Sequence, residues 1–94
     1  MFTDDEVKAR ILFKLYRMGK WGASHTSIEN LKKGFNMRDL GKKGASRVDD
    51  IGKDLIKSNW LLPKPTGYGL EVSLNPQFSR EIVSFIKQFF PDVE

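Results

Sequence analysis

The side chains best suited to binding another molecule are lysines and arginines, which gather in two stretches of the chain. Six cationic residues lie between positions 32 and 47, accompanied there by a single acid, Asp39. All five charged residues between positions 8 and 20 are cationic. Clustered positive charge is the usual footprint of a nucleic-acid-binding surface, although a run of charges can also be only a solvated face. The sequence therefore indicates an anionic partner.

Residue types that carry out catalysis or bind metals are scarce. The chain has no cysteine and one histidine, His25, so we expect no disulfide, no thiolate nucleophile and no structural zinc site. No nucleophile paired with a base, and no pair of carboxylates, stands out, and we expect neither enzymatic activity nor a cofactor. His25 is better explained as a loop residue beside a helix cap than as a catalytic base.

Length and composition favour one folded domain over residues 1–94. The chain is 39% hydrophobic with a formal net charge of +4, which suits a single modest core and a basic surface. Cationic residues at positions 8, 10 and 14 interrupt the early apolar run, and no stretch reaches the length of a transmembrane helix. We therefore expect a cytoplasmic, nucleoid-associated protein that makes no membrane contact.

The strongest structural pattern lies between positions 44 and 74. A helix is predicted over 45–59, because Val48, Ile51 and Leu55 recur at spacings of three and four. The opposite side of this helix is polar. A β-hairpin is predicted directly after it, since apolar and polar residues alternate over 70–74.

The predicted hairpin has a glycine-containing turn at 66–69, where Gly67 and Gly69 can adopt a positive φ. Its first strand would be Leu61 and Leu62. That strand should be short and at a sheet edge, because Pro63 and Pro65 cannot donate ladder hydrogen bonds.

Further helices are predicted from capping residues and apolar spacing. They cover residues 4–18, a short segment opened by a capping box with Thr26 as its N-cap, a helical turn at 37–40, and a last helix at 76–90. The glycine-flanked basic turn 41–44 precedes the helix 45–59. Its backbone amides and lysines would suit a phosphate contact, although an exposed flexible loop is an equally good explanation.

This order of elements resembles the winged helix-turn-helix superfamily over nearly the whole chain. The hairpin sequence at 61–76 and the segment Ser24-His25-Thr26 also look like those of small archaeal winged-helix proteins, most of them uncharacterised. The resemblance implies a mainly α fold with a small β-hairpin wing, an α+β arrangement. Most winged-helix proteins are transcription regulators, and a minority bind RNA or only other proteins.

The resemblance also implies that helix 45–59 enters the major groove of double-stranded DNA. Arg47 would then be the best candidate for a base contact, since arginine can pair bidentately with guanine. The acids at 49, 50 and 54 are unfavourable near phosphates, and we expect Asp49 and Asp54 to lie off the groove face. The expected DNA-binding residues are Lys42, Lys43, Ser46, Arg47, Asp50, Lys53, Lys57 and, at the wing tip, Lys64, Thr66 and Tyr68.

The last helix carries more large apolar residues than one packing stripe needs. We expect the surplus side chains, Val83, Phe85 and Phe90, to form a homodimer interface, because exposed aromatic groups are costly and a two-fold contact covers them.

The sequence therefore predicts a DNA-binding transcription regulator or chromosome-associated protein. The alternative is a winged-helix protein–protein interaction module or a subunit of a nucleic-acid machine, favoured by the acids on helix 45–59. RNA or ribosome binding is a weaker alternative.

Overall fold

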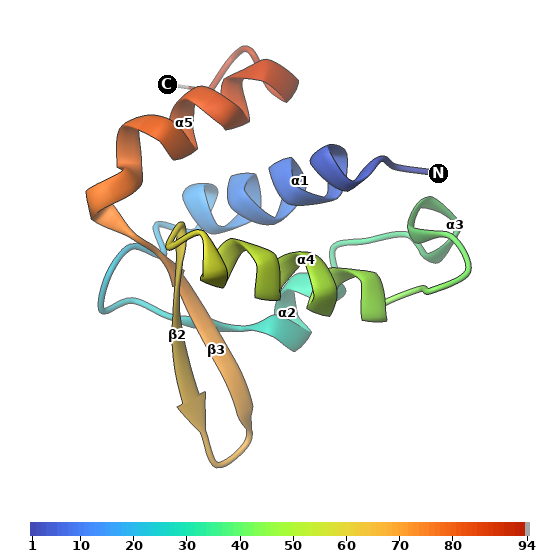
Figure 1. The fold of residues 1–94 in the computed structure, drawn as a ribbon, viewed down its shortest axis with the longest axis horizontal. Coiled ribbons are helices and arrows are strands. Elements are labelled where there is room, and N and C mark those ends of the chain that lie inside the picture. Colours follow the sequence, from blue (N-terminus) through green and yellow to red (C-terminus); the bar gives the residue numbers. More distant parts are fainter. Residues whose placement is uncertain (94) are drawn as a thin grey trace.

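Five helices and a small antiparallel sheet enclose the apolar core in the computed structural model, which describes residues 1–93 (Figure 1). The main helices are α1 (Asp4–Arg17), α4 (Ser46–Lys57) and α5 (Ser79–Phe89). The short helices α2 (Ile28–Lys32) and α3 (Met37–Leu40) connect α1 to α4. The arrangement is a compact α+β domain.

Helix α1 begins at the predicted capping box. The Glu6 amide donates to Thr3 Oγ1 at 3.1 Å, and the Thr3 amide donates to Glu6 Oε1 at 3.0 Å. Both bonds satisfy amides that would otherwise lack partners at a helix start. Val7, Ile11 and Leu15 are fully buried along the inner face, as their helical spacing predicts.

Helix α2 begins one residue later than predicted. Thr26 is not its N-cap but belongs to strand β1 (Thr26–Ser27), and Ser27 caps the helix by accepting from the Asn30 amide at 3.1 Å. Thr26 instead pairs with Val72 of β3 in the sheet. The predicted helical turn at 37–40 is confirmed as α3.

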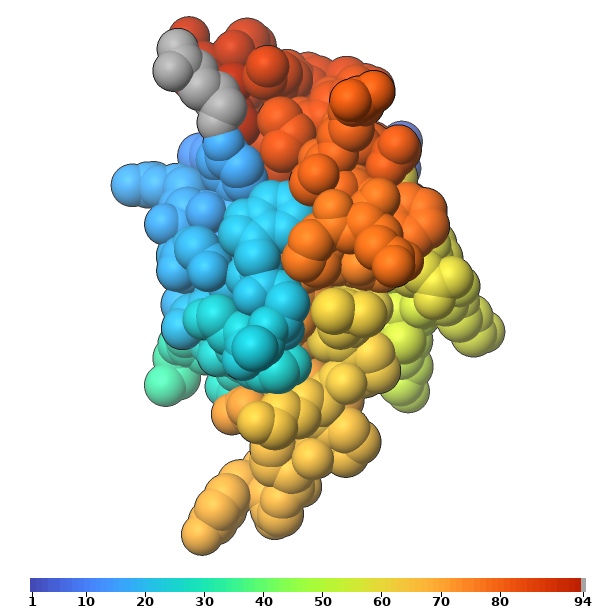
Figure 2. All heavy atoms as spheres, turned by 90° about the vertical axis from the view of Figure 1, so that its left-hand side faces the viewer, coloured from blue at the N-terminus to red at the C-terminus, as the bar shows by residue number. Residues whose placement is uncertain are grey.

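The sheet has the order β1-β3-β2, so β2 (Leu61–Thr66) is an edge strand and β3 (Gly69–Leu74) is central. The first strand of the hairpin was expected to stop before Pro63, but it continues through both prolines to Thr66. Antiparallel ladders use the amides of alternate residues only, so prolines two positions apart can both direct their nitrogens away from the partner strand. The hairpin projects beyond the rest of the molecule in Figure 2.

Gly69 has a φ of 130° at the hairpin turn, as expected, whereas Gly67 does not have a positive φ.

The last helical segment is divided, whereas the sequence predicted one helix from 76 to 90. A short 3₁₀ helix, η1 (Pro76–Phe78), precedes α5. Asn75 caps this turn, since its side chain accepts from the Gln77 amide at 3.0 Å and donates to the Asn59 carbonyl at 2.8 Å. These two bonds fix the tighter geometry. Ile82 and Ile86 then anchor α5 in the core.

Candidate nucleic-acid interface

Helix α4 has one buried and one exposed face. Val48, Ile51 and Leu55 are buried in the core, which fixes the rotation of the helix about its axis. Its exposed positions recur on the other side, as the sequence predicts. They include the expected DNA-binding residues Ser46, Asp50, Lys53 and Lys57.

The turn before α4 presents two exposed lysines, Lys42 and Lys43, between two glycines. Gly44 is buried with a φ of 56°, and a Cβ atom there would lie 2.7 Å from Met37 Cε. Glycine therefore allows the chain to turn close beneath α3. The Lys43 side chain lies 3.7 Å from the Asp50 carboxylate across the surface.

The amides of Ser46 and Arg47 at the start of α4 are already satisfied, so the expected phosphate contact through backbone groups would have to use the amides of Lys42 and Lys43 in the turn. The amides of Ser46 and Arg47 donate to the carbonyls of Lys43 and Gly44, at 3.3 and 3.1 Å. The Ser46 hydroxyl also donates to the Lys43 carbonyl at 2.7 Å. An anion at this end of α4 would therefore meet the lysine side chains and the amides of Lys42 and Lys43, and not the amides of Ser46 and Arg47.

Arg47 does not lie on the exposed face, where the sequence placed it. Its Nη2 and Nε atoms donate to one carboxylate oxygen of Asp4, at 2.8 and 3.3 Å. Only 13% of the Arg47 side chain is exposed, and its Nη1 atom is buried without a hydrogen-bond partner. In the free protein, Arg47, the residue expected to contact a base, is therefore bound to the start of α1.

The three acids of α4 lie in different surroundings. Asp49 leaves the exposed face as expected, and it pairs with Lys32 of α2 at 2.9 Å. Asp54 remains exposed and shares a shallow surface depression with Asp50 and Lys53. Asp54 also lines a second depression that contains Asp4 and Arg47, so it lies at the edge of this face. Its position off the groove face stays a prediction.

Lys32 is held between two carboxylates, Asp49 and Glu29, at 2.9 and 3.0 Å. The hydrogen bond to Asp49 is the main cause that raises the pKa of Lys32, and Glu29 adds to it against an opposing effect of burial. This cluster joins α2 to α4, so it helps to fix the angle at which α4 is presented.

The hairpin tip presents Tyr68 and Lys64, both exposed. Tyr68 is fully exposed, as predicted. Thr66 is committed to the turn instead, because its hydroxyl donates to the Gly69 carbonyl at 2.7 Å and accepts from the Tyr68 amide at 3.2 Å. Thr66 therefore shapes the tip, while Lys64 and Tyr68 remain available for contact.

The expected dimer residues of α5 are half-buried. Phe85 lies edge-on to Trp60, with ring centroids 5.7 Å apart, and Phe90 stacks on Phe13 at 4.2 Å. Val83 lines a shallow depression on the outer side of α5, together with Arg80 and Lys87. Two of the three side chains thus gain cover within one chain, which weakens the physical reason for a homodimer. The homodimer stays a prediction.

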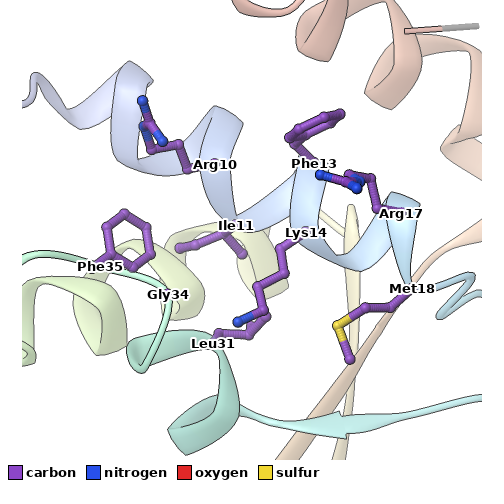
Figure 3. A pocket seen from close by; sticks show the side chains of 9 residues that line it. All are labelled: Arg10, Ile11, Phe13, Lys14, Arg17, Met18, Leu31, Gly34 and Phe35. Carbon is purple, nitrogen blue, oxygen red and sulfur yellow. The ribbon is translucent and has the colours of Figure 1, made fainter.

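Sequence reasoning gave little weight to a second basic surface. The α1 side chains Arg10, Lys14 and Arg17 line a groove beside α2. Figure 3 shows Lys14 extending toward Leu31 of α2, with Arg10 and Arg17 on the upper side of α1. Their common charge is visible in the sequence, but the apolar floor below them forms only when α1 and α2 pack together.

Comparisons of the chain with models of protein families, with curated protein sequences and with solved structures found no match. Residues 1–93 place no three His, Cys, Asp or Glu side chains where they could hold a metal ion. None of the helices in this part of the chain is long and apolar enough to cross a membrane.

Proposed function

We propose that this protein is a winged helix-turn-helix protein that binds double-stranded DNA, with α4 in the major groove and the β2–β3 hairpin along the adjacent backbone. The observation that carries the proposal is a set of exposed lysines. They lie in the turn before α4, in α4 itself and in the β2–β3 hairpin, which are consecutive along the chain. They take part in no ion pair among residues 1–93. These lysines are Lys42, Lys53, Lys57 and Lys64.

The relative position of α4 and the hairpin supports a complex in which α4 enters the major groove and the hairpin contacts the DNA backbone. The two elements lie next to each other in Figure 1, and the exposed side of α4 carries polar residues from its first turn to its last. A major groove about 12 Å wide accepts one helix, while a neighbouring element contacts the backbone. Tyr68 and Lys64 at the tip would extend this contact.

The charges favour binding through phosphates over reading of bases. Arg47 is engaged by Asp4, and Asp50 lies beside Lys43. Lysine contacts to phosphates carry no sequence information, so binding through them tolerates many sequences. A chromosome-associated protein fits this pattern directly. A transcription regulator would first have to release Arg47 from Asp4.

A protein-interaction module is the second candidate, supported by the acids Asp50 and Asp54 on the exposed face of α4. RNA is less favoured, since the deep and narrow major groove of an A-form duplex does not admit a helix.

A titration with random duplex DNA at 50 and 200 mM salt tests the proposal. Four lysine–phosphate contacts predict that affinity falls roughly a hundredfold over this range, since each contact releases counterion. A random RNA duplex of the same length is the control and should bind more weakly. Absence of DNA binding at 50 mM salt would leave the protein-interaction module as the better explanation.

A further inference from the structure

We infer that the groove between α1 and α2 is a docking site for an acidic amphipathic peptide segment of a partner protein. This inference does not rest on the proposed DNA binding, because it concerns a different surface. In Figure 1, α1 runs from right to left above α4 and α2 lies behind α4, whereas in Figure 3 α1 runs from left to right with α2 in front. The groove therefore opens on the side of the molecule away from α4.

The floor of the groove is apolar. Ile11 and Leu31 are fully buried beneath it, and Phe35 is half-buried along one side. Phe13 also lines the groove, but its ring stacks on Phe90. Met18, at the end of α1, is 38% exposed. The volume of the groove is about 430 Å³, which is enough for a few large side chains. Water reaches Met18 and the exposed part of Phe35 in the free chain, and apolar side chains of a partner would displace it there.

The rim of the groove carries three cations and no carboxylate. Arg10, Lys14 and Arg17 follow one another at spacings of four and three on α1, so about 10 Å separates the first from the last along the helix axis. None of the ion pairs within residues 1–93 involves them. Lys43 before α4 and Arg47 within it, in contrast, already face Asp50 and Asp4.

The three cations are held in place without losing their capacity to bind. Lys14 Nζ donates to the Asn30 carbonyl at 3.2 Å and keeps two further N–H donors. The guanidinium of Arg10 lies 4.4 Å from the Phe2 ring centroid, and that of Arg17 lies 5.6 Å from the Phe13 centroid. Stacking on a ring occupies the face of a guanidinium and leaves its N–H edge free for a carboxylate.

The positive charge of the rim and the apolar floor together indicate which kind of molecule binds in the groove. A nucleic acid would use the cations but has no aliphatic groups for the floor. A helical peptide can present carboxylates and apolar anchors at spacings of three and four, which is also the spacing of the cations on α1. A segment with aspartate or glutamate beside leucine or phenylalanine therefore matches both features.

Peptide display on the full chain tests this inference. Random 16-residue peptides would be selected on the immobilised protein, and the most enriched one would be labelled for fluorescence anisotropy. We expect enriched sequences to combine acids with large apolar residues. The variant Arg10→Gln/Lys14→Gln/Arg17→Gln should bind the labelled peptide about tenfold more weakly or worse, whereas Lys53→Gln/Lys57→Gln on α4 should bind it unchanged.

Met18→Glu provides a second variant in case the triple substitution disturbs folding. Its side chain is exposed at the groove end, so a new carboxylate there should repel an acidic peptide while the fold is retained. The inference is overturned if selection yields no peptides, yields peptides without acids, or yields one whose affinity neither variant lowers. It is also overturned if the triple variant loses duplex DNA binding and the α4 variant does not, since the groove would then serve nucleic acid.

Discussion

The guanidinium of Arg47 has two possible anionic partners, the Asp4 carboxylate in the free protein and a phosphate or base in a complex. Its position in the sequence, at the start of a polar-faced helix, predicts the second. The first could not be predicted, because Asp4 lies 43 residues away and meets Arg47 only after α1 and α4 pack. Local periodicity, in contrast, correctly predicted that Ser46, Lys53 and Lys57 are exposed.

Releasing Arg47 should strengthen DNA binding. Asp4→Asn removes the negative charge that holds the guanidinium, so we expect affinity for duplex DNA to rise severalfold, with a loss of roughly 0.3–1 kcal/mol in helix stability. The matched control is Asp5→Asn, because Asp5 is near Lys8 at 3.9 Å and does not contact Arg47. Equal affinities of the two variants, measured by anisotropy, would show that Asp4 does not restrain Arg47.

Lys32 should stabilise the junction of α2 and α4. We expect Lys32→Met to lower the free energy of unfolding by roughly 1 kcal/mol, a value suited to a half-buried pair. The neighbouring Lys33→Met, at an exposed position, should change it much less. Urea unfolding at pH 7 measures both.

The contribution of Lys32 should also depend on pH. Its hydrogen bond to Asp49 raises the pKa of Lys32 above the ordinary 10.5, so the folded state binds this proton more tightly than the unfolded state. The stability difference between the wild type and Lys32→Met should therefore be constant from neutral pH up to 10.5 and shrink as the pH rises through the folded-state pKa. A difference that grows at alkaline pH would contradict the assigned contacts.

At the scale of the elements, spacing and capping residues predicted α1, α3, α4 and the hairpin. The failures have identifiable causes. Thr26 was taken for a helix cap because its pairing with Val72 in the sheet is non-local. The strand through Pro63 and Pro65 was cut short because the missing amide of proline matters only on the paired side of a strand. Such effects depend on tertiary neighbours.

The hairpin tip should contribute to binding and not to folding. Tyr68 is fully exposed, so Tyr68→Ala should change the free energy of unfolding by less than about 0.5 kcal/mol while weakening DNA binding severalfold. Thr66→Val is the contrasting variant, because it removes the hydroxyl that bonds Gly69 and Tyr68 and should destabilise the turn. A large loss of thermal stability in Tyr68→Ala would contradict the free position of this side chain.

At the scale of the whole molecule, the sequence predicted an α+β domain with a small hairpin, but not the sheet order β1-β3-β2. It also could not predict the groove between α1 and α2, since Gly34 and Phe35 complete its wall only after folding.

The homodimer prediction can be tested by sedimentation equilibrium at micromolar concentration. A mass of twice 10.8 kDa that falls to 10.8 kDa in Phe85→Lys or Phe90→Lys would support an interface through α5. A mass of 10.8 kDa at every concentration would show that the contacts of Phe85 with Trp60 and of Phe90 with Phe13 suffice.

The central claim, that the exposed face of α4 binds DNA phosphates, is tested most directly by two variants of equal charge. Lys53→Gln/Lys57→Gln neutralises that face, and Arg80→Gln/Lys87→Gln neutralises the outer face of α5. Duplex affinity is measured against salt concentration for both. The account predicts that the α4 variant binds more weakly and that its logarithmic salt slope falls by about two, while the α5 variant matches the wild type. Equal slopes for the two variants would contradict it.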